Sequence, residues 1–70
     1  MARTTIRRVN EALAAAGFRG VELVRGNGYF YFSGGDTVRW PVTSVYTNRL
    51  TGMTVDEWVD EARRLREEAW

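Results

Sequence analysis

The sequence has 70 residues, enough for one small domain and too few for two lobes closing on a substrate. Hydrophobic residues make up 44% of the chain and charged residues 27%, so it has the apolar surface that disordered chains lack. Ten arginines against nine acidic residues leave a net charge of +1, which argues against a strongly basic nucleic-acid binder and against an acidic DNA mimic. We therefore predict a single folded domain over residues 1–70.

Cysteine and histidine are absent from the sequence. Their absence excludes disulfides, thiolate nucleophiles, Ser-His triads and His-ligated metals, and we predict no cofactor, no metal and no catalytic residue. Asp56 with Asp60, and Glu57 with Glu61, have the spacing of a cation site, but the arginines close by favour a solvated helix face. No apolar run approaches the ~20 residues of a membrane span, so we expect a cytoplasmic protein with no membrane partner.

The first predicted element is a helix from Thr4 or Thr5 to about Ala16. Threonine is a good N-terminal cap, and the alanines that follow are strong helix formers. Gly17 can adopt the left-handed conformation that ends a helix, and Phe18 then folds back onto the helix end. The apolar side chains recur at helical spacing: Ile6, Val9, Leu13 and Ala16.

Two strands are predicted next, at residues 21–25 and 29–32, joined by a tight turn at residues 26–28. Asn27 and Gly28 are typical of a hairpin, since both residue types supply the positive φ angles that such turns require. The alternation along a strand places Phe30 and Phe32 on one face of the sheet, and Tyr29 and Tyr31 on the other. We predict that the phenylalanines face the core.

A second turn at residues 33–36 leads into a segment whose alternation is irregular. Val38, Trp40 and Val42 share one parity, Val45 has the other, and Pro41 stands between them. Since proline belongs on sheet edges or at bulges, the segment is either one broken edge strand over residues 37–47 or a loop followed by a strand at residues 43–47. We favour the second interpretation.

A connector at residues 48–53 precedes the second predicted helix. Thr54 and Glu57 form a capping box, and Trp58 is expected to anchor the core beneath this helix. The predicted fold is α+β: a helix, a three-stranded antiparallel meander and a helix, in two layers with both helices on one face of the sheet. The apolar positions of the second helix are Val55, Trp58, Val59, Ala62, Leu65 and Ala69.

With these motifs in place, the chain resembles a group of small uncharacterised proteins encoded by temperate phages and prophages. The resemblance covers roughly residues 6–62 and is carried by residues 21–32 (VELVRGNGYFYF), 43–46 (TSVY), 49–50 (RL), Thr54 and 58–59 (WV). It implies a phage or mobile-element origin, where small proteins often act by binding host or phage machinery. It assigns no role to any single residue.

One constellation favours a binding function. If the phenylalanines face the helices, the tyrosines emerge on the uncovered face of the sheet, with arginines flanking the strands. Tyrosine, tryptophan and arginine dominate the binding energy of protein interfaces. The predicted partner-binding residues are Tyr29, Tyr31, Tyr46, Arg25, Arg39 and Trp40. The alternative is that the tyrosines only shield a thin sheet from water.

We therefore predict a non-enzymatic protein that binds a host or phage protein and inhibits a host defence component, as an anti-CRISPR or other counter-defence factor. The alternative is a nucleic-acid-binding accessory or regulatory protein that uses the same aromatic and arginine face. Residues 1–25 carry a net charge of +3 and residues 51–70 a net charge of −3. The N-terminal arginines either form a basic patch or pair with the acidic second helix, and the sequence leaves both open.

The tryptophans leave further points open. Trp40 is either a core residue or part of the contact surface. An exposed strip formed by Leu65, Ala69 and Trp70 would be a contact for a homodimer, because exposed apolar strips commonly mark interaction sites.

Overall fold

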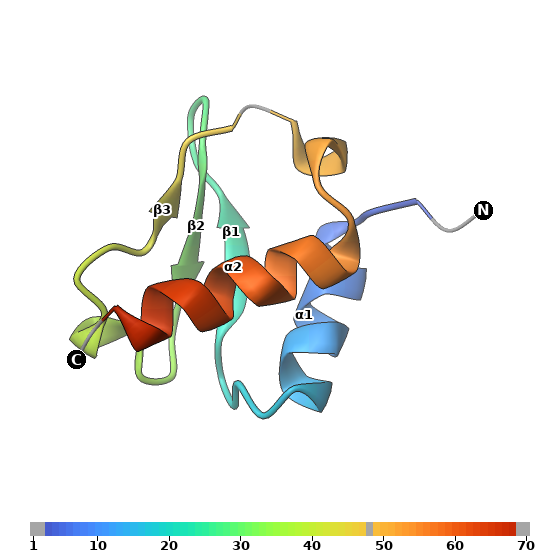
Figure 1. Ribbon diagram of the computed structural model, residues 1–70. Helices are drawn as coiled ribbons and strands as arrows, with labels where there is room; N and C mark the ends of the chain where they lie inside the picture. The colour runs from blue at the N-terminus through green and yellow to red at the C-terminus, as the bar shows by residue number, and fades with distance from the viewer. Residues whose placement is uncertain (1–2, 48, 69–70) are drawn as a thin grey trace.

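The computed structural model describes residues 3–47 and 49–68. Three antiparallel strands form a sheet in the order β1-β2-β3, α2 crosses in front of the strands, and α1 lies beside β1 (Figure 1). The predicted α+β order of helix, meander and helix is confirmed. The elements in chain order are α1 (Ile6–Ala15), β1 (Glu22–Arg25), β2 (Phe30–Ser33), the short 3-10 helix η1 (Thr37–Arg39), β3 (Ser44–Val45), the 3-10 helix η2 (Leu50–Gly52) and α2 (Val55–Glu67).

Helix α1 begins and ends as the sequence predicts. The Thr5 side chain accepts a hydrogen bond from the Arg8 amide at 3.1 Å, so one of the free amides of the first turn is satisfied. Gly17 has a φ of +93°, and the Phe18 amide donates to the carbonyl of Leu13 at 2.9 Å. This turn brings the Phe18 ring into the core, where it is 3% exposed.

Helix α2 begins with the predicted capping box. The Glu57 amide donates to the Thr54 hydroxyl at 3.1 Å, and the Thr54 amide donates to the Glu57 carboxylate at 2.9 Å. One turn later, Trp58 is completely buried over the sheet. Its ring centroid lies 5.4 Å from that of Phe30 and 6.3 Å from that of Phe32, which confirms that the phenylalanines face the helices.

The core lies between the two helices and this phenylalanine face of the sheet. Trp58 occupies its centre, and its indole N–H donates to the carbonyl of Leu50 at 2.9 Å, which ties η2 to α2. Burying a tryptophan in this way requires a partner for its one polar group, and the backbone carbonyl supplies it. The other buried apolar residues are Val9, Leu13, Phe18, Val21, Leu23, Phe30, Phe32, Trp40, Val59, Ala62 and Leu65.

The turn between β1 and β2 differs from the prediction. Gly28 has a φ of +84°, whereas Asn27 has a negative φ, so only one of the two residues takes the conformation that we expected of both. The Gly26 amide donates to the Tyr29 carbonyl at 2.8 Å and closes the hairpin around these two residues. A positive φ at the second central residue alone differs from the type I′ turn, which requires a positive φ at both central residues.

The segment after β2 forms a loop and then a short strand, so the favoured interpretation is confirmed, although β3 spans only Ser44–Val45. Within this loop, Val38 and Trp40 do not share a face although they are two positions apart. Because η1 replaces the extended chain, Val38 is 89% exposed, whereas Trp40 is 6% exposed and packs on Phe18 and Phe32. In the connector, residues 50–52 form η2, and Asn48 lies outside the described residues.

No helix within residues 3–47 and 49–68 combines the length and the apolar character needed to cross a bilayer.

Candidate functional site

Three tyrosines gather on the face of the sheet opposite to the core, and we call Tyr29, Tyr31 and Tyr46 the tyrosine face. The Tyr29 ring centroid lies 6.0 Å from that of Tyr31 and 6.1 Å from that of Tyr46, with interplanar angles of 35° and 38°. These distances are within the range of favourable aromatic contacts. The sequence alternation therefore predicts correctly which side of β2 carries the tyrosines.

The neighbours of the tyrosine face are small or partly buried side chains. Tyr31 stands opposite Val24 on β1 and Ser44 on β3, while Glu22 pairs with Ser33 at the far end of the hairpin. Val24 and Ser44 are therefore the direct cross-strand neighbours of Tyr31.

Gly26 makes room for the central ring of the tyrosine face. A Cβ atom at this position would lie 2.6 Å from the nearest ring carbon of Tyr29, so the tyrosine packs directly on glycine backbone. The φ of Gly26 is not positive, so the glycine is needed for space rather than for its conformational freedom. This contact holds Tyr29 half-buried and places it between the other two rings.

Tyr46 is the most accessible member of the tyrosine face. It is 84% exposed just after β3, whereas Tyr29 and Tyr31 are half-buried by their neighbours. The phenylalanines, Trp40 and Trp58 are sealed in the core, so among the rings that the structure describes Tyr46 is the most open. The tyrosine face therefore offers one open ring beside two half-buried ones.

The other three predicted contact residues do not join the tyrosine face. Arg25 has the parity of Leu23, and its guanidinium lies 5.0 Å from the centroid of the Phe30 ring, on the core side of the sheet. Trp40 belongs to the core, which answers the question that the sequence left open. Arg39 is exposed on η1, outside the three strands.

Three acidic residues of α2 and its C-terminal cap pair with arginines of the same helix. Arg63 pairs with Asp60 at 2.9 Å, and Arg64 pairs with Glu61 at 2.6 Å and with Glu68 at 2.8 Å. The hydrogen bond with Glu61, together with its negative charge, raises the pKa of the Arg64 guanidinium above its ordinary value. No ion pair joins α1 to α2 within the described residues, so the N-terminal arginines do not neutralise the second helix there.

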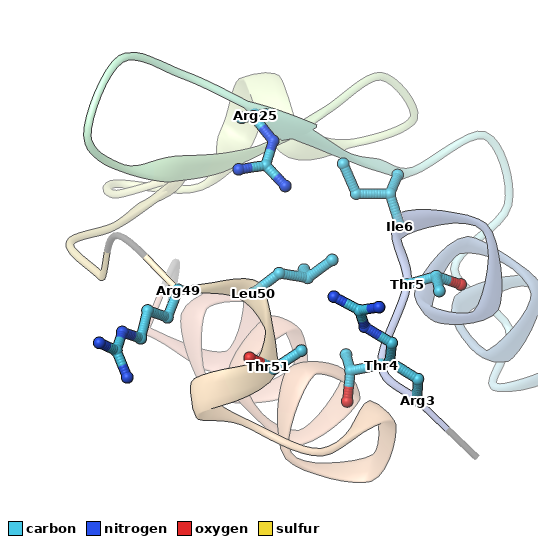
Figure 2. A pocket seen from close by; sticks show the side chains of 8 residues that line it. All are labelled: Arg3, Thr4, Thr5, Ile6, Arg25, Arg49, Leu50 and Thr51. Atoms are coloured by element: carbon cyan, nitrogen blue, oxygen red, sulfur yellow. The ribbon is translucent and has the colours of Figure 1, made fainter.

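Unpaired arginines instead surround a hollow between the start of α1, the end of β1 and η2, and we call it the arginine hollow. Its volume is about 610 Å³. Figure 2 shows Arg3 and Arg25 pointing into it from opposite sides, while Arg49 extends away along its rim. Among the described residues, no carboxylate lines the hollow or lies within 4.0 Å of these three guanidinium groups. The lining residues are Arg3, Thr4, Thr5, Ile6, Arg25, Arg49, Leu50 and Thr51.

Two side-chain hydrogen bonds, one from Thr4 and one to Asn10, join the N-terminal segment to the rest of the fold. The Thr4 hydroxyl donates to the carbonyl of Met53 at 3.0 Å, and so ties the chain before α1 to the segment after η2. Asn10 on α1 accepts a hydrogen bond from the Leu23 amide at 2.7 Å, and so satisfies an edge amide of β1. Sequence analysis missed Asn10, because an isolated polar residue within an amphipathic helix carries no pattern that identifies its partner.

The predicted dimer strip is not formed as expected. Leu65 is 2% exposed and belongs to the core, so it cannot contribute to a surface. Ala69 and Trp70 lie outside the described residues.

In the part of the chain that the structure describes, no group of three or more histidine, cysteine, aspartate or glutamate residues gathers as a metal site would. The chain matches no known protein family, no curated protein and no solved structure.

Proposed function

We propose that this protein is a non-enzymatic binding module that captures another protein with its tyrosine face. The observation that carries the proposal is the ring of Tyr46, which is 84% exposed and is backed by Tyr29 at a centroid distance of 6.1 Å. Tyrosine is among the residues that dominate interface energetics, because its rigid ring buries a large area at small entropic cost. A supported and open tyrosine is therefore suited to act as an anchor.

The proposed partner is a host or phage protein. The resemblance to small phage proteins supports the narrower hypothesis of an inhibitor of a host defence component, such as an anti-CRISPR or other counter-defence factor. The absence of cysteine and histidine from the sequence supports a role in binding rather than in catalysis.

The alternative of nucleic acid on the tyrosine face has less support. Bases stack on exposed aromatic rings, but a phosphate backbone also needs cations along the same face. Arg25, which we expected to supply one of them, lies on the core side of the sheet beside Phe30.

The test compares Tyr46→Ala with Val38→Ala. Both side chains are almost fully exposed, so neither substitution is expected to unfold the chain, and only the first removes a ring from the tyrosine face. The immobilised full-length protein is exposed to a nuclease-treated bacterial lysate, and a retained protein is then purified and titrated. We expect Tyr46→Ala to weaken its binding by about tenfold or more, as for other tyrosine anchors, and Val38→Ala to leave it unchanged.

Three outcomes would contradict the proposal. The first is equal binding of the purified partner by the wild type and Tyr46→Ala. The second is capture of a protein from an untreated lysate but of none from the nuclease-treated lysate, which would indicate nucleic acid as the bridge. The third is a dimer on size-exclusion chromatography that dissociates in Tyr46→Ala, which would assign the face to self-association.

A further inference from the structure

We propose that the arginine hollow binds the phosphodiester backbone of a nucleic acid, independently of the tyrosine face. Three arginines from distant parts of the sequence line one open hollow, Arg3 before α1, Arg25 at the end of β1 and Arg49 before η2, and the guanidinium groups of Arg3 and Arg25 point into it (Figure 2). Arginine is always charged and presents a planar fork of donors that matches phosphate oxygens. Positive charges gathered without a counterion repel one another, and a bound anion would relieve this repulsion.

The charges next to the hollow strengthen this argument. The first turn of α1 contains no acidic residue, although it carries Arg7 and Arg8, whereas the first turn of α2 contains Asp56 and Glu57. Arg7 reaches Glu11 at 3.8 Å, and Arg8 has no carboxylate within 4.0 Å among the described residues. Basic residues at the positive end of a helix dipole are unfavourable unless an anion lies near them.

The arrangement fits a chain of phosphates better than a single phosphate ion. A single ion is held most tightly by donors that converge on one point. Here Arg3 and Arg25 point into the hollow while Arg49 runs along the rim, so the charges are spread over the surface (Figure 2). Arg8 adds an exposed cation in the first turn of α1, in a neighbouring hollow that it lines together with Thr5, Arg7 and Glu11. Cations spread in this way match the repeating charges of a phosphodiester chain.

An acidic peptide is a less suitable occupant. Extended peptides gain much of their affinity by adding a strand to a free sheet edge. The edge nearest the hollow belongs to β1, and the Leu23 amide on that strand already donates to Asn10. The hollow also lies on the opposite side of the sheet from the tyrosines, so no stacking platform faces it, and we expect binding without strong sequence preference.

The experiment measures fluorescence anisotropy of a labelled 12-nucleotide oligothymidylate with the full-length protein over a range of salt concentrations. Contact with three phosphates of a single strand predicts a slope of log K against log salt of about −2. The variant Arg3→Gln/Arg25→Gln is compared with Arg19→Gln/Arg63→Gln, which removes the same two charges at positions that do not line the hollow. We expect the hollow variant to bind about tenfold or more weakly with a shallower slope, and the control to lose much less.

Additional measurements separate the arginine hollow from the tyrosine face and single-stranded from double-stranded nucleic acid. Tyr46→Ala should bind the oligonucleotide like the wild type, so this result is independent of the proposed protein partner. A duplex of the same length distinguishes double-stranded from single-stranded nucleic acid as the source of the backbone. Substitution of Arg25 removes a contact with the Phe30 ring and could lower the melting temperature of Arg3→Gln/Arg25→Gln. In that case the binding of Arg49→Gln, which changes a residue on the rim of the hollow, is compared with that of Arg63→Gln.

The proposal would be overturned by any of four results. The first is that the wild type binds neither oligonucleotide at low salt, and the second is that the hollow and control variants lose equal affinity. The third is displacement of the oligonucleotide by inorganic phosphate at concentrations that leave the ionic strength unchanged. The fourth is tighter binding of a polyglutamate peptide than of the oligonucleotide.

Discussion

Asn10 shows how one polar side chain can protect a sheet edge. Strand β1 lies at the edge of the sheet, where free amides invite pairing with another chain. The side-chain carbonyl oxygen of Asn10 accepts a hydrogen bond from the Leu23 amide at 2.7 Å, and the Leu23 side chain is buried, with 2% of its surface exposed. The side chain therefore provides a hydrogen bond that a neighbouring strand would otherwise provide, and it couples α1 to β1.

Removing this acceptor should destabilise the domain. We expect Asn10→Ala to lower the free energy of unfolding by about 1–3 kcal/mol, because the Leu23 amide loses its partner in a partly buried place. Alanine is the better helix former, so a loss cannot be attributed to helix propensity. Urea denaturation measures the change, and Asn10→Asp, which keeps an acceptor oxygen, is the control. Equal stability of Asn10→Ala and the wild type would contradict the assignment.

At the scale of elements, the β1–β2 hairpin depends on two glycines for different physical reasons. Gly28 needs its backbone conformation, with a φ of +84° and no atom within 4 Å of an added Cβ. Gly26 needs its missing side chain, because the Tyr29 ring occupies that space. The first glycine therefore serves the turn, and the second serves the tyrosine face.

The two glycines can be separated by substitution. We expect Gly28→Ala to cost about 1–2 kcal/mol of stability through left-handed strain, with the tyrosine face left in place. Gly26→Ala should displace the Tyr29 ring and weaken binding of the captured partner several-fold more than Gly28→Ala does. Thermal unfolding and titration of the purified partner give the two readouts. A greater loss of binding in Gly28→Ala than in Gly26→Ala would refute the packing role of Gly26.

At the scale of the whole molecule, two tryptophans fill one core in different ways. Trp58 donates its indole N–H to Leu50, whereas the buried indole nitrogen of Trp40 has no hydrogen-bond partner among the described residues. We expect Trp58→Phe to cost about 1 kcal/mol more than Trp40→Phe, since both lose similar volume and only the first loses a hydrogen bond. Urea denaturation of both variants decides this, and a larger loss in Trp40→Phe would contradict it.

Local patterns predict the regular parts of this molecule. The caps at Thr5 and Thr54, the Gly17 stop and the opposite directions of Phe30 and Tyr31 all follow from residues within a few positions of one another. Such features depend on short-range sterics and hydrogen bonds, which the order of residues encodes directly.

Long-range features could not be predicted in the same way. Alternation over residues 37–42 treats the segment as extended, but η1 rotates Val38 outward and Trp40 inward. Arg25 flanks the tyrosines in sequence, and strand parity directs it to the other side of the sheet. The arginine hollow joins residues up to 48 positions apart, from Arg3 to Thr51, through tertiary packing alone, so no spacing in the sequence could reveal it.

The hydrogen bond between Thr4 and Met53 implies that the arginine hollow forms late during synthesis of the chain. A ribosome must release the chain past η2 before Arg3, Arg25 and Arg49 can meet, because these residues belong to three separate segments. A shorter nascent chain would carry its arginines without the assembled arginine hollow. Any ligand that needs all three would select finished molecules over partly made ones, and by mass action it would shift the folding equilibrium toward the completed domain.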